Sequence, residues 1–241
     1  MIIMRKLNLI YILFIIVLLI SIPLVWIKTR PNEQLNQNPS REIKYVSIGD
    51  SYTIGLGIDE RDRWPNVLTN HLRERGINIR LVANPSVSGY TVVDAIELEV
   101  PAIESLKPDL VTVLIGANDS FIRKSQDDFQ SDLIELLDQL QQLIPNPKNI
   151  ILVTIPDYSK SPSVQQNATT DGLSDFIASY NNIIKNEANK RDLKVADIFL
   201  VSQTMTGQAD YTEDGLHPSG EGYAKWEKVI LPVVSSKLGS P

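Results

Sequence analysis

The chain has 241 residues, 43% of them hydrophobic, which is enough for one large or two small domains with an ordinary globular core. The formal net charge of −6 argues against nucleic acid as the main partner, because phosphate binding needs a basic surface. The absence of cysteine excludes disulfides, thiolate metal sites and a cysteine nucleophile, and the only histidines are His71 and His217.

Residues 7–27 form an almost unbroken apolar stretch, interrupted only by Asn8, Ser21 and Pro23. A helix of that length spans about 30 Å, the thickness of the hydrocarbon core of a bilayer. We therefore expect residues 1–27 to be an N-terminal transmembrane anchor. A buried core helix is a poorer interpretation, because the stretch has no polar face. A cleaved signal peptide is the other alternative, although no small-residue cleavage site follows the apolar run.

Residues 28–42 are rich in Pro, Asn and Gln and contain one large apolar side chain, Leu35, so they predict a flexible linker. Arg5, Lys6 and the amino terminus precede the apolar stretch, and Lys28 and Arg30 follow it, so a slight excess of positive charge before the stretch favours an extracytoplasmic carboxyl domain. The protein would then be membrane-anchored, or secreted if the N-terminal segment is cleaved. Five of the 23 basic and two of the 29 acidic residues precede position 43, which leaves the following domain with a formal charge of −9.

From residue 43 onward, strand-like and helix-like patterns alternate, as is typical of βαβ units in a parallel sheet. The expected strands are 44–49, 78–83, 110–115, 149–155 and 193–198. The expected helices are 64–75, 91–106, 125–143, 170–190 and 219–238. Pro101 is able to kink or split the second of these helices. Together they predict one α/β domain over residues 43–241, a three-layer α/β/α sandwich around a five-stranded parallel sheet.

Four loops that follow predicted strands contain residues able to carry chemistry. They hold Gly49-Asp50-Ser51, the stretch 84–89, Gly116-Ala117-Asn118-Asp119 and Asp214-Gly215-Leu216-His217-Pro218. The carboxyl ends of parallel strands lie on one edge of a sheet, so we expect these loops to converge.

Ser51 is the candidate nucleophile among these residues. His217 can act as its base, and Asp214, three residues earlier, can accept a hydrogen bond from the other ring nitrogen and fix the tautomer. The backbone amides of Ser51 and Gly89 and the side-chain amide of Asn118 would donate to the oxyanion that forms when an acyl carbonyl is attacked. The predicted catalytic residues are therefore Ser51, Asp214 and His217, with an oxyanion hole formed by Ser51, Gly89 and Asn118.

These blocks, in this order, resemble those of the SGNH/GDSL hydrolase family of lipases and acylhydrolases. The family's functional serine, glycine, asparagine and histidine correspond to Ser51, Gly89, Asn118 and His217, with Asp214 completing the triad. The resemblance extends over about residues 43–238. It implies a flavodoxin-like fold and hydrolysis of carboxylic esters, thioesters or O-acetyl groups on sugars, without a metal or organic cofactor.

The substrate implied by this resemblance is a small or medium-chain acyl ester, a lysophospholipid or an acetylated sugar. Two alternatives use the same scaffold. A non-catalytic sugar- or lipid-binding module would be expected to have lost the serine, histidine or asparagine. An O-acyltransferase would need the same residues while excluding water from its acyl-enzyme.

Several other residues are interpreted as structural. Asp50 and Asp119 are expected to support their loops, and His71 is expected to be a partly buried helix residue. Tyr52 stands where many family members have Leu or Ile, a difference that should affect packing more than chemistry. The polar stretch 156–171 is either a lid that shapes acyl specificity or a surface loop without a role.

Overall fold

A computed structural model describes residues 41–167 and 169–239. The predicted transmembrane stretch 7–27 and nearly all of the predicted linker 28–42 lie outside these described residues. Within the described ranges, no helix is both long and apolar enough to cross a bilayer.

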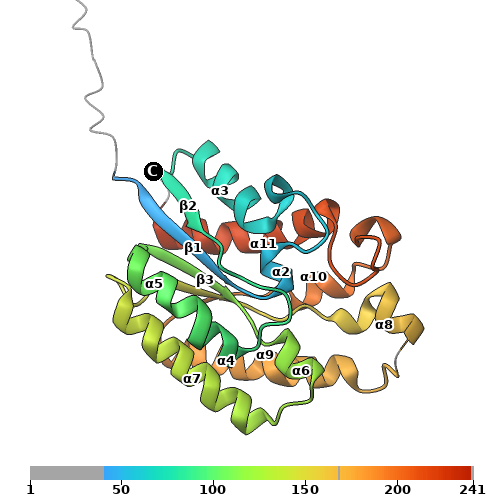
Figure 1. The fold of residues 1–241 in the computed structure, drawn as a ribbon. Coiled ribbons are helices and arrows are strands. Elements are labelled where there is room, and N and C mark those ends of the chain that lie inside the picture. Colours follow the sequence, from blue (N-terminus) through green and yellow to red (C-terminus); the bar gives the residue numbers. More distant parts are fainter. Residues whose placement is uncertain (1–40, 168, 240–241) are drawn as a thin grey trace, which may run out of the picture. The chain divides into compact units, whose positions relative to one another are not determined.

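Five parallel strands form one sheet in the order β2-β1-β3-β4-β5 (Figure 1). The strands are β1 (Ile43–Gly49), β2 (Ile79–Ala83), β3 (Leu110–Leu114), β4 (Ile150–Val153) and β5 (Lys194–Ala196). The predicted five-stranded parallel sheet is therefore confirmed, and its strand order is that of flavodoxin-like folds. Every residue of β3 and β4 is buried, as expected of parallel strands covered on both faces.

Helices lie on both faces of the sheet and produce the predicted three layers (Figure 1). On one face, α3 (Trp64–Glu74) packs against α11 (Gly220–Leu238). The other face is covered by α4 (Val92–Asp94), α5 (Val100–Leu106), α7 (Gln126–Leu143) and α9 (Leu173–Lys190). Short helices that the sequence patterns did not predict are α2 (Ser51–Ile54), α6 (Ala117–Phe121), α8 (Pro162–Asn167) and α10 (Phe199–Gln203), with 3-10 turns η1 (Glu60–Asp62), η3 (Tyr158–Lys160) and η4 (Gln208–Asp210).

The helix predicted over 91–106 is divided by a π-helical turn, η2 (Ala95–Glu99), that separates α4 from α5. Pro101 lies in the first turn of α5, and without an N–H it cannot continue the hydrogen-bond pattern of the preceding helix. The segment stays helical from Val92 to Leu106, so its irregularity is this π turn, directly before the position where Pro101 was expected to kink or split the helix. A π turn contains one more residue than an α turn, and it leaves the Glu99 side chain fully buried.

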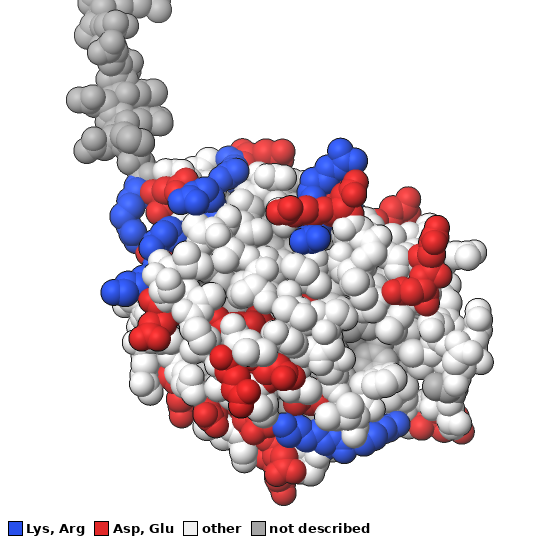
Figure 2. Space-filling model, viewed as in Figure 1, with Lys and Arg blue, Asp and Glu red and all other residues white. Residues whose placement is uncertain are grey.

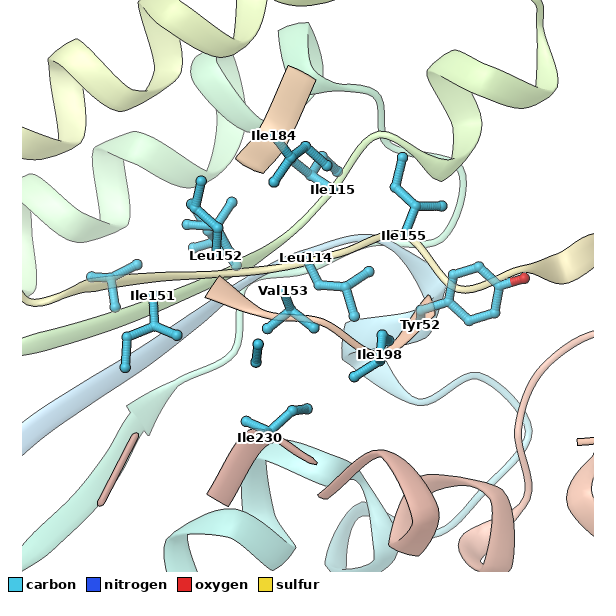
Figure 3. Close-up of a cluster of buried hydrophobic side chains, with 14 of the residues drawn as sticks. Tyr52, Leu114, Ile115, Ile151, Leu152, Val153, Ile155, Ile184, Ile198 and Ile230 are labelled. Atoms are coloured by element: carbon cyan, nitrogen blue, oxygen red, sulfur yellow. The ribbon is translucent and has the colours of Figure 1, made fainter. Parts of the chain in front are cut away.

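The hydrophobic core fills both spaces between the sheet and its helices (Figure 3). Consecutive strand residues point to opposite faces, so Leu152 and Val153 of β4 belong to different layers. Leu152 lies near Ile184 of α9, whereas Val153 lies on the side of Ile230 of α11 (Figure 3). Tyr52 reaches the same core from the turn after β1, with 5% of its surface exposed.

The polar stretch 156–171 is not a simple surface loop, because it contains η3 and α8 and several of its residues are buried. The buried carboxylate of Asp157 accepts hydrogen bonds from Ser159 Oγ (2.5 Å) and Ser174 Oγ (2.6 Å). It also accepts one from Gln203 Nε2 at 2.9 Å, which ties the stretch to α9 and α10. The polar side chains of this stretch, which suggested an exposed loop in the sequence, therefore include several that form hydrogen bonds inside the protein.

Candidate active site

The three residues predicted to be catalytic meet at the carboxyl edge of the sheet. Ser51 begins α2 directly after β1, and His217 lies on the loop before α11. The distance between His217 Nε2 and Ser51 Oγ is 2.8 Å, and that between His217 Nδ1 and Asp214 Oδ2 is 2.6 Å. The imidazole therefore joins the hydroxyl and the carboxylate in one hydrogen-bonded series.

The sharp turn from β1 into α2 depends on Gly49 and Asp50. A Cβ at Gly49 would lie 2.1 Å from the carbonyl oxygen of Leu114, so only glycine fits. Asp50 caps α2, with Oδ1 accepting the backbone N–H of Tyr52 at 3.0 Å, which is the loop-supporting role predicted for it. The N–H of Ser51 belongs to the first turn of α2, where amides have no intrahelical acceptor.

Asp214 is held as an anion by its own loop. Its Oδ1 accepts the backbone N–H groups of Leu216 (2.8 Å) and His217 (2.9 Å) and the hydroxyl of Thr212 (2.8 Å). Partial desolvation opposes ionisation, but the hydrogen bonds from His217 and the loop outweigh it and lower the pKa of Asp214 to about 2. A fixed negative charge thus faces the imidazole nitrogen remote from Ser51.

The side chain of His217 is 9% exposed, and the ring of Tyr52 packs beside it. The centroids of these two rings are 5.4 Å apart, and the Tyr52 centroid is 5.7 Å from that of Trp226 on α11. Tyr52 thus connects the base to the core, in line with the packing role expected for it.

Gly89, in the loop after β2, and Asn118, in the first turn of α6, line the same pocket as Ser51 and His217. Gly89 has φ +89°, and a Cβ there would have nothing within 4 Å, so backbone conformation rather than crowding calls for glycine. Asn118 Nδ2 donates to the carbonyl of Tyr90 at 2.8 Å. Because an amide nitrogen carries two hydrogens, Asn118 can donate to a second acceptor in the pocket.

The pocket beside Ser51 has a volume of about 220 Å³, and its walls include aromatic and apolar side chains that sequence reasoning missed. These are Ala117, Phe121, Tyr158 and Leu216. Phe121 is 67% exposed, and its ring centroid lies 6.3 Å from that of Tyr158. Figure 2 shows a hollow between the positions of α6 and α8 that is bordered mainly by uncharged side chains. The available sequence signals were the positions of Ala117 and Leu216 inside the motif blocks, that of Phe121 two residues after Asp119, and that of Tyr158 in the stretch 156–171.

His71 lies away from this site, where α3 packs against α11. Its Nδ1 is 2.8 Å from Oε1 of the buried Glu227, in agreement with the structural role predicted for it. Among the residues that the structure describes, no group of three or more histidine, aspartate or glutamate side chains is arranged to hold a metal ion.

A flavodoxin-like sheet with serine, histidine and aspartate in series at its carboxyl edge is the arrangement expected of a serine hydrolase. The model of the GDSL-like lipase/acylhydrolase family matches residues 47–225, and the chain belongs to that family. The resemblance stated above is therefore confirmed.

Curated relatives with esterase names match this chain. A multidomain esterase of Ruminococcus flavefaciens is 32% identical over 139 residues, which are 56% of this chain and 17% of the relative. An arylesterase of Vibrio mimicus is 24% identical over 74% of this chain and 81% of its own length. An acetylxylan esterase of Xylanibacter ruminicola is 23% identical over 87% of this chain and 45% of its own length. The chain thus spans a small part of the first relative and under half of the third.

A solved structure of the lipase/acylhydrolase from Enterococcus faecalis superposes with a TM-score of 0.66, over 83% of this chain and 98% of that one. At 20% identity, this likeness concerns the fold. Family membership and the names of the relatives support an ester-hydrolysing enzyme.

Proposed function

We propose that this chain hydrolyses carboxylic esters through an acyl-enzyme formed on Ser51. The observation that carries the proposal is the position of His217, hydrogen-bonded to Ser51 Oγ at 2.8 Å and to the Asp214 carboxylate at 2.6 Å. As Ser51 Oγ attacks the acyl carbonyl, His217 Nε2 takes its proton and then gives it to the leaving alcohol. Water attacks the acyl-enzyme with the same base and releases the acid, while Asp214 holds the Nδ1–H.

The negative oxygen formed at each attack needs donors already in place. Ser51 N–H at the start of α2, Gly89 N–H in the loop after β2 and the free N–H of Asn118 in the first turn of α6 supply them around one pocket. Their fixed positions support the proposal, because such donors stabilise the transition state without reorganisation.

The pocket favours an uncharged, small or medium acyl group. Its volume is about 220 Å³, and no lysine or arginine is among its lining residues. Simple acyl esters and acetylated sugars present such a group, whereas a lysophospholipid presents a longer acyl chain that would have to extend beyond the pocket. The names of two relatives, arylesterase and acetylxylan esterase, support the first two. A series of p-nitrophenyl esters of increasing acyl length, compared with acetylated sugars, would identify the preferred class.

Substitution of the nucleophile tests the reaction. We expect Ser51→Ala to abolish turnover of p-nitrophenyl acetate and butyrate and to prevent labelling by a fluorophosphonate, which reacts with activated serines. Ser88→Ala is the matched control, because Ser88 also lines the pocket, and this variant should still be labelled at Ser51. Wild-type turnover by Ser51→Ala would contradict the mechanism, as would labelling of the wild type at another residue.

We further propose that residues 1–27 anchor the chain in a membrane and that residues 28–42 link this anchor to an extracytoplasmic hydrolase domain, 43–241. The apolar stretch 7–27 supports this topology. The full-length chain should remain in the membrane fraction after a high-salt wash and dissolve in detergent, and its domain should be accessible to protease added outside the membrane. Recovery of the full-length chain in the soluble fraction would contradict the anchor, and recovery of a shortened chain would indicate cleavage.

A further inference from the structure

Glu99 is fully buried close to the nucleophile, although it belongs to none of the sequence motifs. Its Oε2 accepts the backbone N–H of Gly49, two residues before Ser51, at 2.8 Å. Its other oxygen, Oε1, is buried without a hydrogen-bond partner among the described residues. A buried carboxyl group that is only half satisfied is costly and calls for a functional explanation.

The structure shows why Gly49 requires this acceptor. The pairing of β1 with β2 ends at Val46 and Ala83, where β2 leaves the sheet for the loop that carries Gly89. Beyond that point, the Glu99 carboxyl group replaces a strand carbonyl as acceptor for Gly49. Since Glu99 is the last residue of η2, the π turn is the local distortion that brings it there.

A second carboxyl group, that of Asp50, holds the same turn at the end that follows Ser51. Its Oδ1 accepts the N–H of Tyr52, while Oδ2 is likewise buried and unpartnered in the part of the chain that is described. Both the hydroxyl and the backbone N–H of Ser51 project from the short segment between these two carboxyl groups. A shift of this segment would therefore move the nucleophile and one oxyanion donor together.

We infer that Glu99 is a positioning residue of the active site. Its carboxyl group holds the Gly49–Ser51 turn through the N–H of Gly49 and so determines the positions of the Ser51 hydroxyl and N–H. This inference rests on the proposed function, because it assigns Glu99 a role in the chemistry of Ser51. Glu99 acts through the turn and does not touch the substrate.

The charge of Glu99 connects this role to pH. Burial raises its pKa to about 8, the hydrogen bond from Gly49 opposes the rise, and the carboxylates of Asp50 and Asp94 add to it. Asp94 faces it from α4, and Asp50 faces it from the turn after β1. A pKa of about 8 keeps Glu99 mostly protonated at neutral pH. Above about pH 8 it becomes a buried anion next to the donors that must stabilise a negative oxygen, so hydrolysis should slow.

Two substitutions of Glu99 separate the hydrogen bond from the charge. Glu99→Gln keeps an acceptor for Gly49 and has the shape and neutral charge of the protonated acid. Glu99→Leu removes the acceptor. The control is Glu227→Gln, which alters another buried glutamate, between α3 and α11. Steady-state kinetics with p-nitrophenyl acetate from about pH 6 to about pH 10, and the rate of fluorophosphonate labelling of Ser51, provide the readouts.

We expect Glu99→Gln to retain kcat within about threefold of wild type at neutral pH and to lose the alkaline decline with a midpoint near 8. Glu99→Leu should lower kcat and the labelling rate by about tenfold or more at every pH, with KM little changed. Glu227→Gln should keep the alkaline decline of the wild type.

An alkaline decline that survives in Glu99→Gln with the same midpoint near 8 would overturn the inference, and so would a folded Glu99→Leu with wild-type kcat. If Glu99→Leu does not fold, the pH profile of Glu99→Gln decides. These results differ from failure of the proposed function, in which the wild-type enzyme itself would neither turn over esters nor be labelled at Ser51.

Discussion

The carboxylate of Asp119 accepts the backbone N–H of Val92, with 3.1 Å between Oδ2 and the nitrogen. This bond connects the loop that presents Asn118 to the start of α4, which follows the loop that presents Gly89. A second connection is made by Asn118 itself, through its hydrogen bond to Tyr90. The segments that carry Gly89 and Asn118, two of the three proposed oxyanion donors, are thereby joined by two hydrogen bonds.

Removal of the Asp119 carboxylate should therefore lower kcat as well as the stability of the fold. Asp119→Ala leaves the Val92 N–H without an acceptor and removes the 3.5 Å ion pair that Lys124 makes in addition to its pair with Asp132. We expect kcat to fall about tenfold or more, with about 1–3 kcal/mol lost from the free energy of unfolding. Asp119→Asn keeps an acceptor and should be milder in ester hydrolysis and in urea denaturation. Equal kcat for the two variants would show that the bond to Val92 does not matter.

Neutralising Asp214 should affect catalysis while leaving substrate binding nearly intact. An asparagine cannot stabilise the imidazolium that forms at His217, and it can hold the wrong ring tautomer. We expect Asp214→Asn to lower kcat by about 10³–10⁴, as in other serine hydrolases with this series, with KM changed by less than about threefold. Single-turnover acylation by p-nitrophenyl acetate measures the effect directly. A loss smaller than about tenfold would contradict the role of Asp214 as orienter.

Gly49 and Gly89 should respond differently to alanine. A Cβ at Gly49 would collide with Leu114 O at 2.1 Å and Thr53 Oγ1 at 2.4 Å, so Gly49→Ala should lower the melting temperature sharply or prevent folding.

At Gly89 there is open space, and only the left-handed backbone opposes a side chain, at a cost of about 1–2 kcal/mol. Gly89→Ala should fold but lose about tenfold to a hundredfold in kcat, because its N–H would be displaced. Thermal denaturation together with kinetics separates the two cases. The expectation fails if Gly89→Ala unfolds or retains full activity.

Phe121 should control acyl-chain preference. Its side chain is 67% exposed and forms part of the pocket wall, so Phe121→Ala removes little buried surface. The free energy of unfolding should change by less than about 0.5 kcal/mol. The ratio of kcat/KM for octanoate esters to that for acetate esters should change by about threefold or more. It falls if the Phe121 ring contacts the longer acyl chain, and it rises if the ring blocks that chain. An unchanged ratio would show that the acyl chain does not contact Phe121.

The stability of the domain should depend on pH through Asp50. Burial raises its pKa from 3.8 to about 7, so its contribution to the free energy of unfolding is fully present below about pH 4 and is lost as pH rises through about 7. Asp50→Asn retains the oxygen that caps α2 and removes the titration. Melting temperatures from pH 4 to 8 should therefore decline less in this variant than in the wild type. Parallel curves would mean that Asp50 is ionised in the folded protein.

The sheet and the meeting of Ser51, Asn118 and His217 were predictable because they follow from general properties of the chain. Alternating apolar strands and amphipathic helices indicate a parallel sheet, and a parallel sheet brings its carboxyl-end loops together. The position of Asp214 three residues before His217 was enough to suggest their pairing, since both side chains come from one short loop.

Glu99 and Tyr158 could not be found in the same way. Glu99 lies in a segment with a helical pattern, where a glutamate ordinarily faces water, and only the π turn buries it. Tyr158 lies in a polar stretch whose hydrogen bonds are made internally, through partners such as Ser120 Oγ at 2.9 Å. Long-range contacts decide both positions, and they leave no periodic signal in the sequence.

The direction of β1 has a practical consequence. The strand begins with Ile43 at the end of the sheet where the amino ends of the strands lie. It ends with Gly49 at the opposite, carboxyl end, about 20 Å away at ~3.3 Å per residue. Arg41, which pairs with Asp109, marks the point where the chain enters the domain. A fluorophore, a fusion partner or a solid support attached at that point would sit behind the enzyme and leave the approach to Ser51 open. The domain is thus suited to immobilisation through its amino-terminal side.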